Sequence, residues 1–170
     1  MYFQNDNDRI ADFTDFVGET ILTRLREGSI KYLGRVGVDP PPRVVNALSV
    51  EPTKPRLINS MRAVNLFCQT KDFTLLPLSE IVQNIPAGSY FSAMDDTQGY
   101  KHLSLTPESY QYLFEFAGHW FCDTTLPFGW KLSAYVYTTV GEVLSEWVRS
   151  RGIYTALWID DRFLGLAPPI

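Results

Sequence analysis

Two adjacent aspartates, Asp160 and Asp161, interrupt an apolar run near the end of the chain. Tyr154 to Ile159 precede them and Phe163-Leu164 follow, a pattern that predicts two strands joined by an acidic turn. A second strand-like segment, Tyr90 to Asp95, also ends in an acid. If these strands are neighbours, three carboxylates meet, and hard cations such as Mg²⁺ prefer oxygen ligands. A pair of ions can clamp an in-line phosphoryl displacement, so the pattern indicates nucleotidyl transfer.

The Asp160-Asp161 pair also has a simpler interpretation. Asp is common in turns because it tolerates left-handed backbone geometry and forms hydrogen bonds with its own backbone. The sequence around the pair is therefore needed to distinguish a simple turn from a metal site. No His-Asp pattern accompanies Ser92 or Ser133, and the glycines do not form a phosphate-binding loop of the Walker or Rossmann type.

Composition sets the broad class of the chain. Its 170 residues are 45% hydrophobic and 14% aromatic, which is enough for a substantial globular core. No apolar run is long enough for a membrane span, and the polar start is unlike a secretory signal, so we expect a cytosolic or nuclear protein. Cys68 and Cys122 have no metal-ligand spacing and are expected to be reduced residues in or near the core.

The charge is unevenly distributed along the chain. The net charge of −4 argues mildly against a general nucleic-acid-binding protein. The span from Arg24 to Arg62, however, contains eight basic and three acidic residues. A basic region combined with an acidic, metal-binding one suits a polyanionic substrate, although such charges are more often only solvated.

Hydrophobic periodicity and turn residues predict an alternation of helices and strands. The expected helices are 8–27, 78–85, 106–116 and 131–151. The expected strands are 44–50, 56–59, 88–95, 120–125, 153–159 and 163–166, with an irregular connector over 34–42 and a hairpin turn over 52–55.

Four motifs in this order resemble those of reverse transcriptases. Lys54-Pro55-Arg56-Leu57-Ile58, followed by Met61-Arg62-Ala63-Val64-Asn65, resembles the fingers motif, and Phe91 to Asp95 with Gly99, Tyr100 and His102 resembles the first palm motif. Leu126-Pro127-Phe128-Gly129-Trp130 with Ser133 resembles the motif beneath the template-primer. Trp158-Ile159-Asp160-Asp161 is similar to the tetrad that ends in two aspartates. The segment Val44 to Val50 further resembles retrotransposons that encode a tyrosine recombinase.

The resemblance implies an α+β fold: a polymerase palm with a ferredoxin-like core, in which the 106–116 and 131–151 helices back an antiparallel sheet. The implied segments are an N-terminal helix and connector (1–42), fingers (43–90) and a partial palm (91–170). The sequence stops soon after the paired aspartates, so we expect the thumb and RNase H portions to be absent and supplied in cis or in trans.

The resemblance also implies a role for each site residue in RNA-directed DNA polymerisation. Asp95 and Asp160 would hold two Mg²⁺ or Mn²⁺ ions, with Asp161 as a weaker ligand and the Asp96 carbonyl as an additional one. Deoxynucleoside triphosphate and template-primer would be bound by the remaining set: Lys54, Arg56, Arg62, Asp96, Gln98, Gly99, Tyr100, Phe128 and Gly129. Within it, Tyr100 would exclude ribonucleotides by colliding with a 2′-hydroxyl.

The chain departs from the family pattern at three positions, and its truncation and acidic pI leave other functions open. Ser60 replaces an Asp found in many members two residues before Arg62, Trp158 replaces a Tyr, and Arg162 follows the aspartates directly. One alternative is a catalytically inactive palm-fold remnant that binds nucleic acid or protein. A second is an RNA-directed RNA polymerase, against which Tyr100 argues. The alternative for Tyr100 is a tyrosine of the hydrophobic core. The alternative for Phe128 and Gly129 is a turn that leads into a helix and is buried by aromatic residues.

Overall fold

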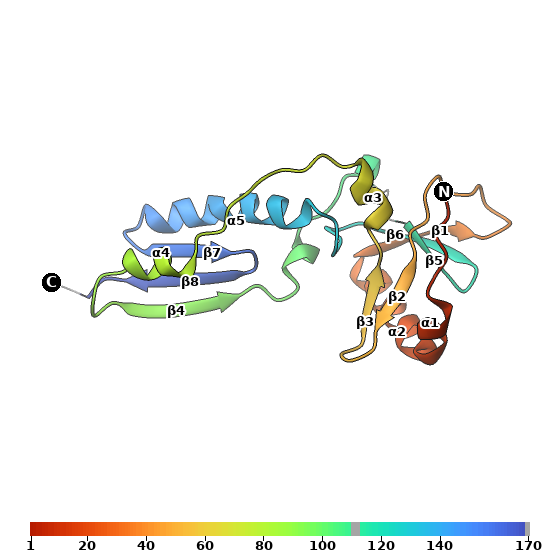
Figure 1. The fold of residues 1–170 in the computed structure, drawn as a ribbon, viewed down its shortest axis with the longest axis horizontal. Helices are drawn as coiled ribbons and strands as arrows, with labels where there is room; N and C mark the ends of the chain where they lie inside the picture. Colours follow the sequence, from red (N-terminus) through yellow and green to blue (C-terminus); the bar gives the residue numbers. More distant parts are fainter. Residues whose placement is uncertain (110–112, 169–170) are drawn as a thin grey trace. The chain divides into compact units, whose positions relative to one another are not determined.

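The computed structural model describes residues 1–109 and 113–168 and has an α+β fold with antiparallel sheets (Figure 1). The chain forms two compact units, each made of two separate segments. Unit 1 comprises Met1–Gln69 and Tyr100–Ser133, and unit 2 comprises Thr70–Gly99 and Ala134–Ile170. The segment expected at 1–42 lies wholly in unit 1, whereas 43–90 and 91–170 each contribute to both units.

Unit 1 begins with two helices where the sequence predicts one. They are α1 (Asn7–Asp12) and α2 (Thr14–Glu27). Phe13 separates them because its backbone leaves the helical region, with φ −125° and ψ 25°. Gly28 ends α2 at the predicted position, since its φ of 74° is left-handed and its N–H bonds the carbonyls of Arg24 and Leu25.

A three-stranded antiparallel sheet follows, in the order β1-β6-β5. Its strands are β1 (Ile30–Arg35), β5 (Leu113–Phe116) and β6 (His119–Asp123). The predicted helix 106–116 is wrong. Only Pro107–Ser109 is helical, as a 3₁₀ turn (η2), and the predicted positions 110–112 lie outside the described residues. Residues 113–116 instead pair with β6, a ladder that their aromatic content favours.

The predicted hairpin with its turn at residues 52–55 is present in the structure. β2 (Leu48–Glu51) pairs with β3 (Arg56–Asn59), and residues 52–55 form the turn. β2 starts later than the predicted strand 44–50, because Val45 and Asn46 take part only in isolated bridges to other segments. Helix α3 (Arg62–Phe67) comes directly after the hairpin.

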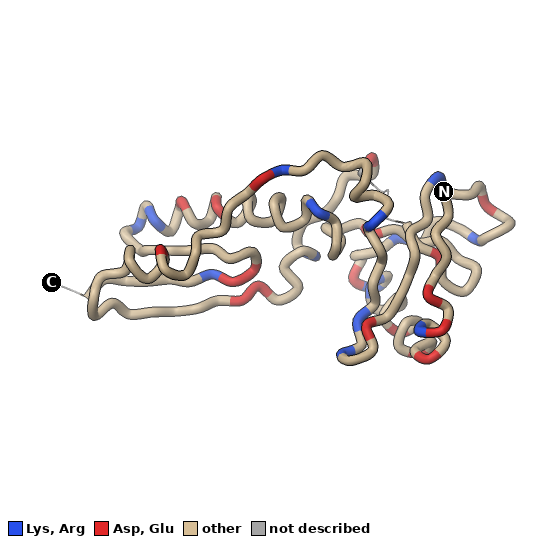
Figure 2. Tube along the Cα trace, in the orientation of Figure 1, with Lys and Arg blue, Asp and Glu red and all other residues tan. Residues whose placement is uncertain are grey.

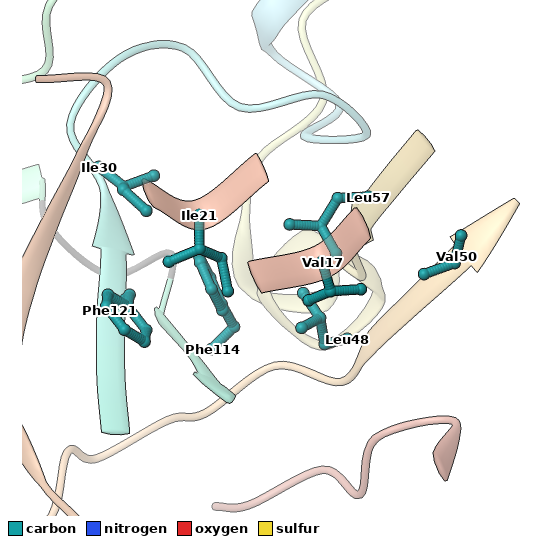
Figure 3. Close-up of a cluster of buried hydrophobic side chains, with 8 residues drawn as sticks. All are labelled: Val17, Ile21, Ile30, Leu48, Val50, Leu57, Phe114 and Phe121. Carbon is teal, nitrogen blue, oxygen red and sulfur yellow. The ribbon is translucent and has the colours of Figure 1, made fainter. Parts of the chain in front are cut away.

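One hydrophobic cluster joins these elements, and Figure 3 shows it in close-up. Side chains from α2, the β2–β3 hairpin and the three-stranded sheet fill it: Val17, Ile21, Ile30, Leu48, Val50, Leu57, Phe114 and Phe121. Phe114 and Phe121 stack at 5.6 Å between ring centroids. The cluster therefore makes the strand at 113–116 part of the core of unit 1.

Unit 2 contains a second three-stranded antiparallel sheet, in the order β4-β8-β7 (Figure 1). Its elements are α4 (Leu78–Gln83), β4 (Tyr90–Asp95), β7 (Tyr154–Trp158), β8 (Asp161–Leu166) and α5 (Ser133–Arg149), whose first residue belongs to unit 1. Each lies within two or three residues of the element predicted from the sequence. The 3₁₀ turn η1 (Gly99–His102) follows β4.

Helix α5 packs closely on one face of this sheet. A Cβ added at Gly141 would lie 2.5 Å from Leu157 Cδ2, so glycine allows the close approach. The buried Arg162 side chain reaches from β8 to the helix, where it donates to Ser145 Oγ at 2.7 Å and to the Gly141 carbonyl at 2.8 Å. Small and polar residues thus make this contact.

The two cysteines do not form a disulfide. Cys68 and Cys122 are both free, the first partly exposed and the second buried. Burial raises the pKa of the Cys122 thiol to about 11.

Within residues 1–109 and 113–168, no helix combines the length and apolar character that crossing a lipid bilayer requires.

Candidate active site

The acids of the palm motifs gather at one end of the unit 2 sheet. Asp95 at the end of β4 lies directly opposite Asp161 at the start of β8, and Asp161 in turn lies opposite Trp158 of β7. Residues opposite each other in an antiparallel ladder project from the same face of the sheet. Figure 2 shows the acidic positions close together at this end of the strands. Asp95, Asp161 and Trp158 therefore form one row across the three strands.

The neighbouring residues belong to the other face. Because side chains alternate along a strand, Met94, Arg162 and Leu157 form the next row on the face that packs against α5. The acid row consequently lies on the face opposite α5. Asp95 and Asp161 are both exposed there.

Asp160 is held beside the row by a tight turn. Ile159 adopts a left-handed conformation, with φ 58°, and reverses the chain between β7 and β8. The Asp160 carbonyl accepts a hydrogen bond from the Asp96 backbone N–H at 3.1 Å. Backbone contacts therefore join the Asp95-Asp96 pair to the Asp160-Asp161 pair, which the sequence places far apart.

The Asp96 carboxylate is engaged on the α5 side of the sheet. Its Oδ2 accepts a short hydrogen bond from the hydroxyl of Tyr137 on α5, while the Asp96 carbonyl accepts the Gly99 N–H at 3.2 Å. Burial raises the pKa of the Tyr137 hydroxyl, and the hydrogen bond and the negative charges of Asp96 and Asp160 raise it further. The hydroxyl therefore keeps its proton and acts as the donor to Asp96.

The acid row borders an open groove of about 310 Å³. Ala93, Ala156 and Phe163 line it on the face of the acids, together with Ile81 of α4. Asp95 and Asp161 stand at one end of a mostly apolar lining that also includes Arg162. The groove thus places apolar side chains beside two solvent-exposed carboxylates.

The acids supply carboxylate oxygens for a metal ion but not a complete set of protein ligands. Among residues 1–109 and 113–168, no three His, Cys, Asp or Glu side chains are grouped so as to hold a metal ion. Mg²⁺ usually takes only one or two carboxylates and completes its shell with waters and substrate phosphates. Two exposed carboxylates opposite each other, with Asp160 adjacent, are compatible with a site of that kind.

The residues predicted to bind triphosphate belong to unit 1. Lys54 lies in the turn of the β2–β3 hairpin, and Arg56 at the start of β3 is opposite Glu51. Arg62 is the first residue of α3. All three basic residues are exposed, and Figure 2 shows basic positions at the tip of the hairpin. Their side chains are accessible to an anionic ligand.

Helix α3 also fixes the turn that contains Phe128 and Gly129. Asn65 Nδ2 donates to the Gly129 carbonyl at 2.8 Å, and its Oδ1 accepts the Lys131 N–H at 3.0 Å. Trp130 Nε1 donates to Cys68 Sγ at 3.2 Å. Gly129 has φ 82°, a left-handed conformation in which other residues are strained.

Tyr100 and Phe128 form an aromatic pair within unit 1. Their ring centroids lie 5.0 Å apart at an interplanar angle of 33°. Phe128 is 72% exposed, so its ring is accessible as well as packed. Gln98 and Gly99 belong to unit 2, where Gln98 occupies the turn after β4 with a left-handed φ of 54°.

The structure therefore groups the predicted site residues within two units. Unit 2 brings together Asp95, Asp96, Asp160, Asp161, Gln98 and Gly99, and unit 1 contains Lys54, Arg56, Arg62, Tyr100, Phe128 and Gly129. Sequence reasoning missed the contacts of Tyr137 and Asn65. Tyr137 shares a helical face with Ser133 and Gly141 at four-residue spacing, and that spacing was the available signal.

Comparison with solved structures decides the fold. The foamy viral protease-reverse transcriptase in complex with dsDNA matches 96% of this chain with a TM-score of 0.74 and 17% identity. The chain has a reverse-transcriptase-like fold. The selenomethionine-labelled CSH mutant of the Prototype Foamy Virus protease-reverse transcriptase matches 99% of the chain, with a TM-score of 0.73 and 18% identity.

The likeness to these reverse transcriptases covers only part of their length. The chain spans 32% of the first protein and 21% of the second. No protein-family model and no curated protein matches the sequence. At this level of identity the comparison shows the fold alone.

Proposed function

We propose that the chain is the fingers-and-palm part of an RNA-directed DNA polymerase from a retroelement, of the kind that also encodes a tyrosine recombinase. One observation carries the proposal: the ladder that places Asp95 opposite Asp161, with Asp160 bonded to Asp96 next to them. This arrangement occurs within a reverse-transcriptase-like fold, and the four motifs occur in the family's order. Phosphoryl transfer asks the protein mainly for positioning and charge stabilisation, which such an arrangement can supply.

The acids are the proposed holders of Mg²⁺ or Mn²⁺. Asp95 and Asp160 would bind the ions, with Asp161 as a weaker ligand and the Asp96 carbonyl as a further oxygen. When bound, two such ions would activate a primer 3′-hydroxyl and neutralise charge on the triphosphate. The open groove beside Asp95 and Asp161 would leave room for the waters and substrate phosphates that complete the coordination of such an ion.

The basic and aromatic residues of unit 1 are the proposed nucleotide-binding set. Arg56 and Arg62 would bind phosphate oxygens through paired N–H donors, and Lys54 would act as a point charge. Tyr100, backed by the Phe128 ring, would meet a ribose 2′-hydroxyl and favour deoxynucleotides. Gln98, Gly99 and Gly129 would contact the nucleotide or template through their backbones.

The proposed partners are a template-primer duplex and deoxynucleoside triphosphates. One similar structure is described as a complex with dsDNA, which supports a nucleic-acid partner for this chain. The thumb and RNase H portions would be supplied in cis or in trans. The setting would be cytoplasmic or nuclear.

Primer extension on an RNA template tests the proposal. The assay compares the chain, joined to a thumb-containing continuation, with its Asp160→Asn variant and with Glu146→Gln, which changes an exposed acid on α5. We expect extension by the unsubstituted protein and by Glu146→Gln, and loss of it in Asp160→Asn. Equal extension by all three proteins would remove the assignment.

A non-catalytic palm-fold scaffold is the second candidate. The net charge of −4, which is unlike the basic charge usual for nucleic-acid-binding domains, favours it. Metal titration separates the two, because a ligand at one hundred times its dissociation constant stabilises a protein by about 2.7 kcal/mol. A polymerase should show a rise in melting temperature with Mn²⁺ that Asp95→Asn reduces, whereas a scaffold should show none.

A further inference from the structure

We propose that Tyr137 is a positioning residue for the acid-bearing strand ends. From the α5 side of the sheet it holds Asp96, and Asp96 in turn fixes Asp95 relative to Asp160. The inference builds on the proposed function, because it concerns the same acids. Neither the motifs nor the proposed ligand set includes Tyr137.

The contacts of Asp96 show why it can transmit this effect. Its N–H donates to the Asp160 carbonyl, its own carbonyl accepts the Gly99 N–H, and its carboxylate accepts the Tyr137 hydroxyl. All three of its hydrogen-bonding groups are therefore engaged. Because Asp96 directly follows Asp95, a shift of Asp96 moves Asp95 and its link to the β7–β8 turn together.

Strand alternation places Tyr137 where it can act without blocking the site. Asp95 belongs to the exposed face with Asp161, and the next residue, Asp96, turns to the α5 face. Tyr137 is only 8% exposed and so is anchored in the helix–sheet packing. The open face remains available to a ligand while the support lies behind it.

Gly99 completes the arrangement. A Cβ added to Gly99 would lie 2.6 Å from the Tyr137 hydroxyl and 2.8 Å from Cζ of the ring. The phenol therefore packs directly on the backbone that follows Asp96. Only a residue without a side chain at position 99 leaves room for Tyr137 to reach the carboxylate.

A matched set of variants separates the hydrogen bond from the bulk of the ring. Tyr137→Phe keeps the ring and removes the donor, and Asp96→Ala removes the acceptor. Asp96→Asn removes the charge but keeps an oxygen that can accept the bond. Gly99→Ala displaces the ring by steric contact. Tyr154→Phe is the control, because the buried Tyr154 hydroxyl has no hydrogen-bond partner in the described part of the chain.

The first measurement is amide hydrogen exchange of the chain without metal, at Asp96 and Gly99. We expect Tyr137→Phe and Gly99→Ala to lower the protection of both amides about tenfold, as a hydrogen bond to a charged group predicts. Tyr154→Phe should leave them unchanged. Unchanged protection in Tyr137→Phe would overturn the proposal, whatever the chain does with metal.

The second measurement is Mn²⁺ affinity, from the concentration dependence of the melting temperature. We expect Tyr137→Phe to weaken binding about tenfold in the presence of Asp96 and to have no further effect in the Asp96→Ala background. In the Asp96→Asn background Tyr137→Phe should still weaken binding, because the hydrogen bond is retained there. Equal effects of Tyr137→Phe in all three backgrounds would contradict positioning through Asp96.

The two readouts also distinguish failure of this inference from failure of the proposed function. If the unsubstituted chain binds no Mn²⁺, the proposed function is wrong. The role of Tyr137 in positioning metal ligands is then wrong too, even if hydrogen exchange shows that its hydrogen bond to Asp96 protects the two amides. If the unsubstituted chain binds Mn²⁺ and Tyr137→Phe binds it equally well, only the role of Tyr137 is wrong.

Discussion

Asp95 lies directly opposite Asp161 in the ladder between β4 and β8, so two like charges face each other across neighbouring strands. Charges of one sign in that position destabilise a sheet. Both carboxylates are exposed at the end of the strands. We therefore expect the pair to lower stability at the place where the proposed chemistry needs carboxylates.

Neutralising one acid should therefore stabilise the protein. We expect Asp95→Asn and Asp161→Asn each to raise the free energy of unfolding by about 0.2–1 kcal/mol, more at low than at high salt. Urea denaturation at two ionic strengths measures this, with Glu146→Gln as the exposed control. A loss of stability in both variants would show that the acids do not repel each other in the folded chain.

The buried Asp123 predicts a pH dependence in unit 1. Asp123 is 7% exposed and accepts a hydrogen bond from Asn59 Nδ2 at 2.9 Å. Burial raises the pKa of this carboxyl from 3.8 to about 6, against the opposing effects of Asn59 and Arg24. A raised pKa means that the folded state binds the proton more tightly than the unfolded state.

The stabilising contribution of Asp123 is therefore complete below about pH 4 and is lost as the pH rises through 6. We expect Asp123→Asn to gain stability relative to the unsubstituted chain between pH 4 and 7, by roughly 2–3 kcal/mol. Urea denaturation across this range, with the exposed Glu19→Gln as control, measures the difference. A constant difference at every pH would contradict the raised pKa.

Two helical glycines should respond oppositely to alanine. Gly18 in α2 has nothing within 4 Å of an added Cβ, so Gly18→Ala should stabilise by about 0.5–1 kcal/mol through helix propensity. At Gly141 the added Cβ meets Leu157 at 2.5 Å, and we expect a net loss of about 1 kcal/mol despite the same gain in propensity. Thermal melts of both variants test this, and stabilisation by Gly141→Ala would show that α5 can move away from the sheet.

The pair of Tyr100 and Phe128 predicts how sugar selection can be relaxed. We expect Tyr100→Ala to raise ribonucleotide incorporation relative to deoxynucleotide incorporation by about tenfold or more, because the ring that would meet the 2′-hydroxyl is removed. Phe128→Ala should give a smaller change, since Phe128 supports that ring at 5.0 Å. Single-nucleotide extension with each triphosphate measures the ratio. No gain in Tyr100→Ala would count against the gate and favour an RNA-directed RNA polymerase.

Local pattern predicted much of the fold, because several elements have unambiguous boundaries. Arg56 to Asn59 is a strand as expected, since turn residues precede it and two of its four positions are buried. The same holds for the strand that ends at Asp95 and for the reversal at Asp160. The last two features put Asp95 and the Asp160-Asp161 pair at strand ends, and the pairing of β4 with β8 that brings them together comes from the structure.

Tertiary pairing accounts for what the sequence did not predict. Residues 113–116 have helix-compatible spacing after Thr106-Pro107, but Phe114 is fully buried against Phe121 of the neighbouring strand, and that ladder prevails. The hydrogen bond of Tyr137 with Asp96 joins a helix to a strand end far away in sequence. No local pattern encodes such a partner, so it became visible only in the structure.

The two units interleave along the chain, with crossings after Gln69, Gly99 and Ser133. A single truncation or proteolytic cut therefore cannot release either one intact. A ribosome also finishes every described strand of unit 1 before it has made β7 and β8. The acidic end of the unit 2 sheet forms only after β8 has been made, because β4 pairs with β8 across a long stretch of sequence.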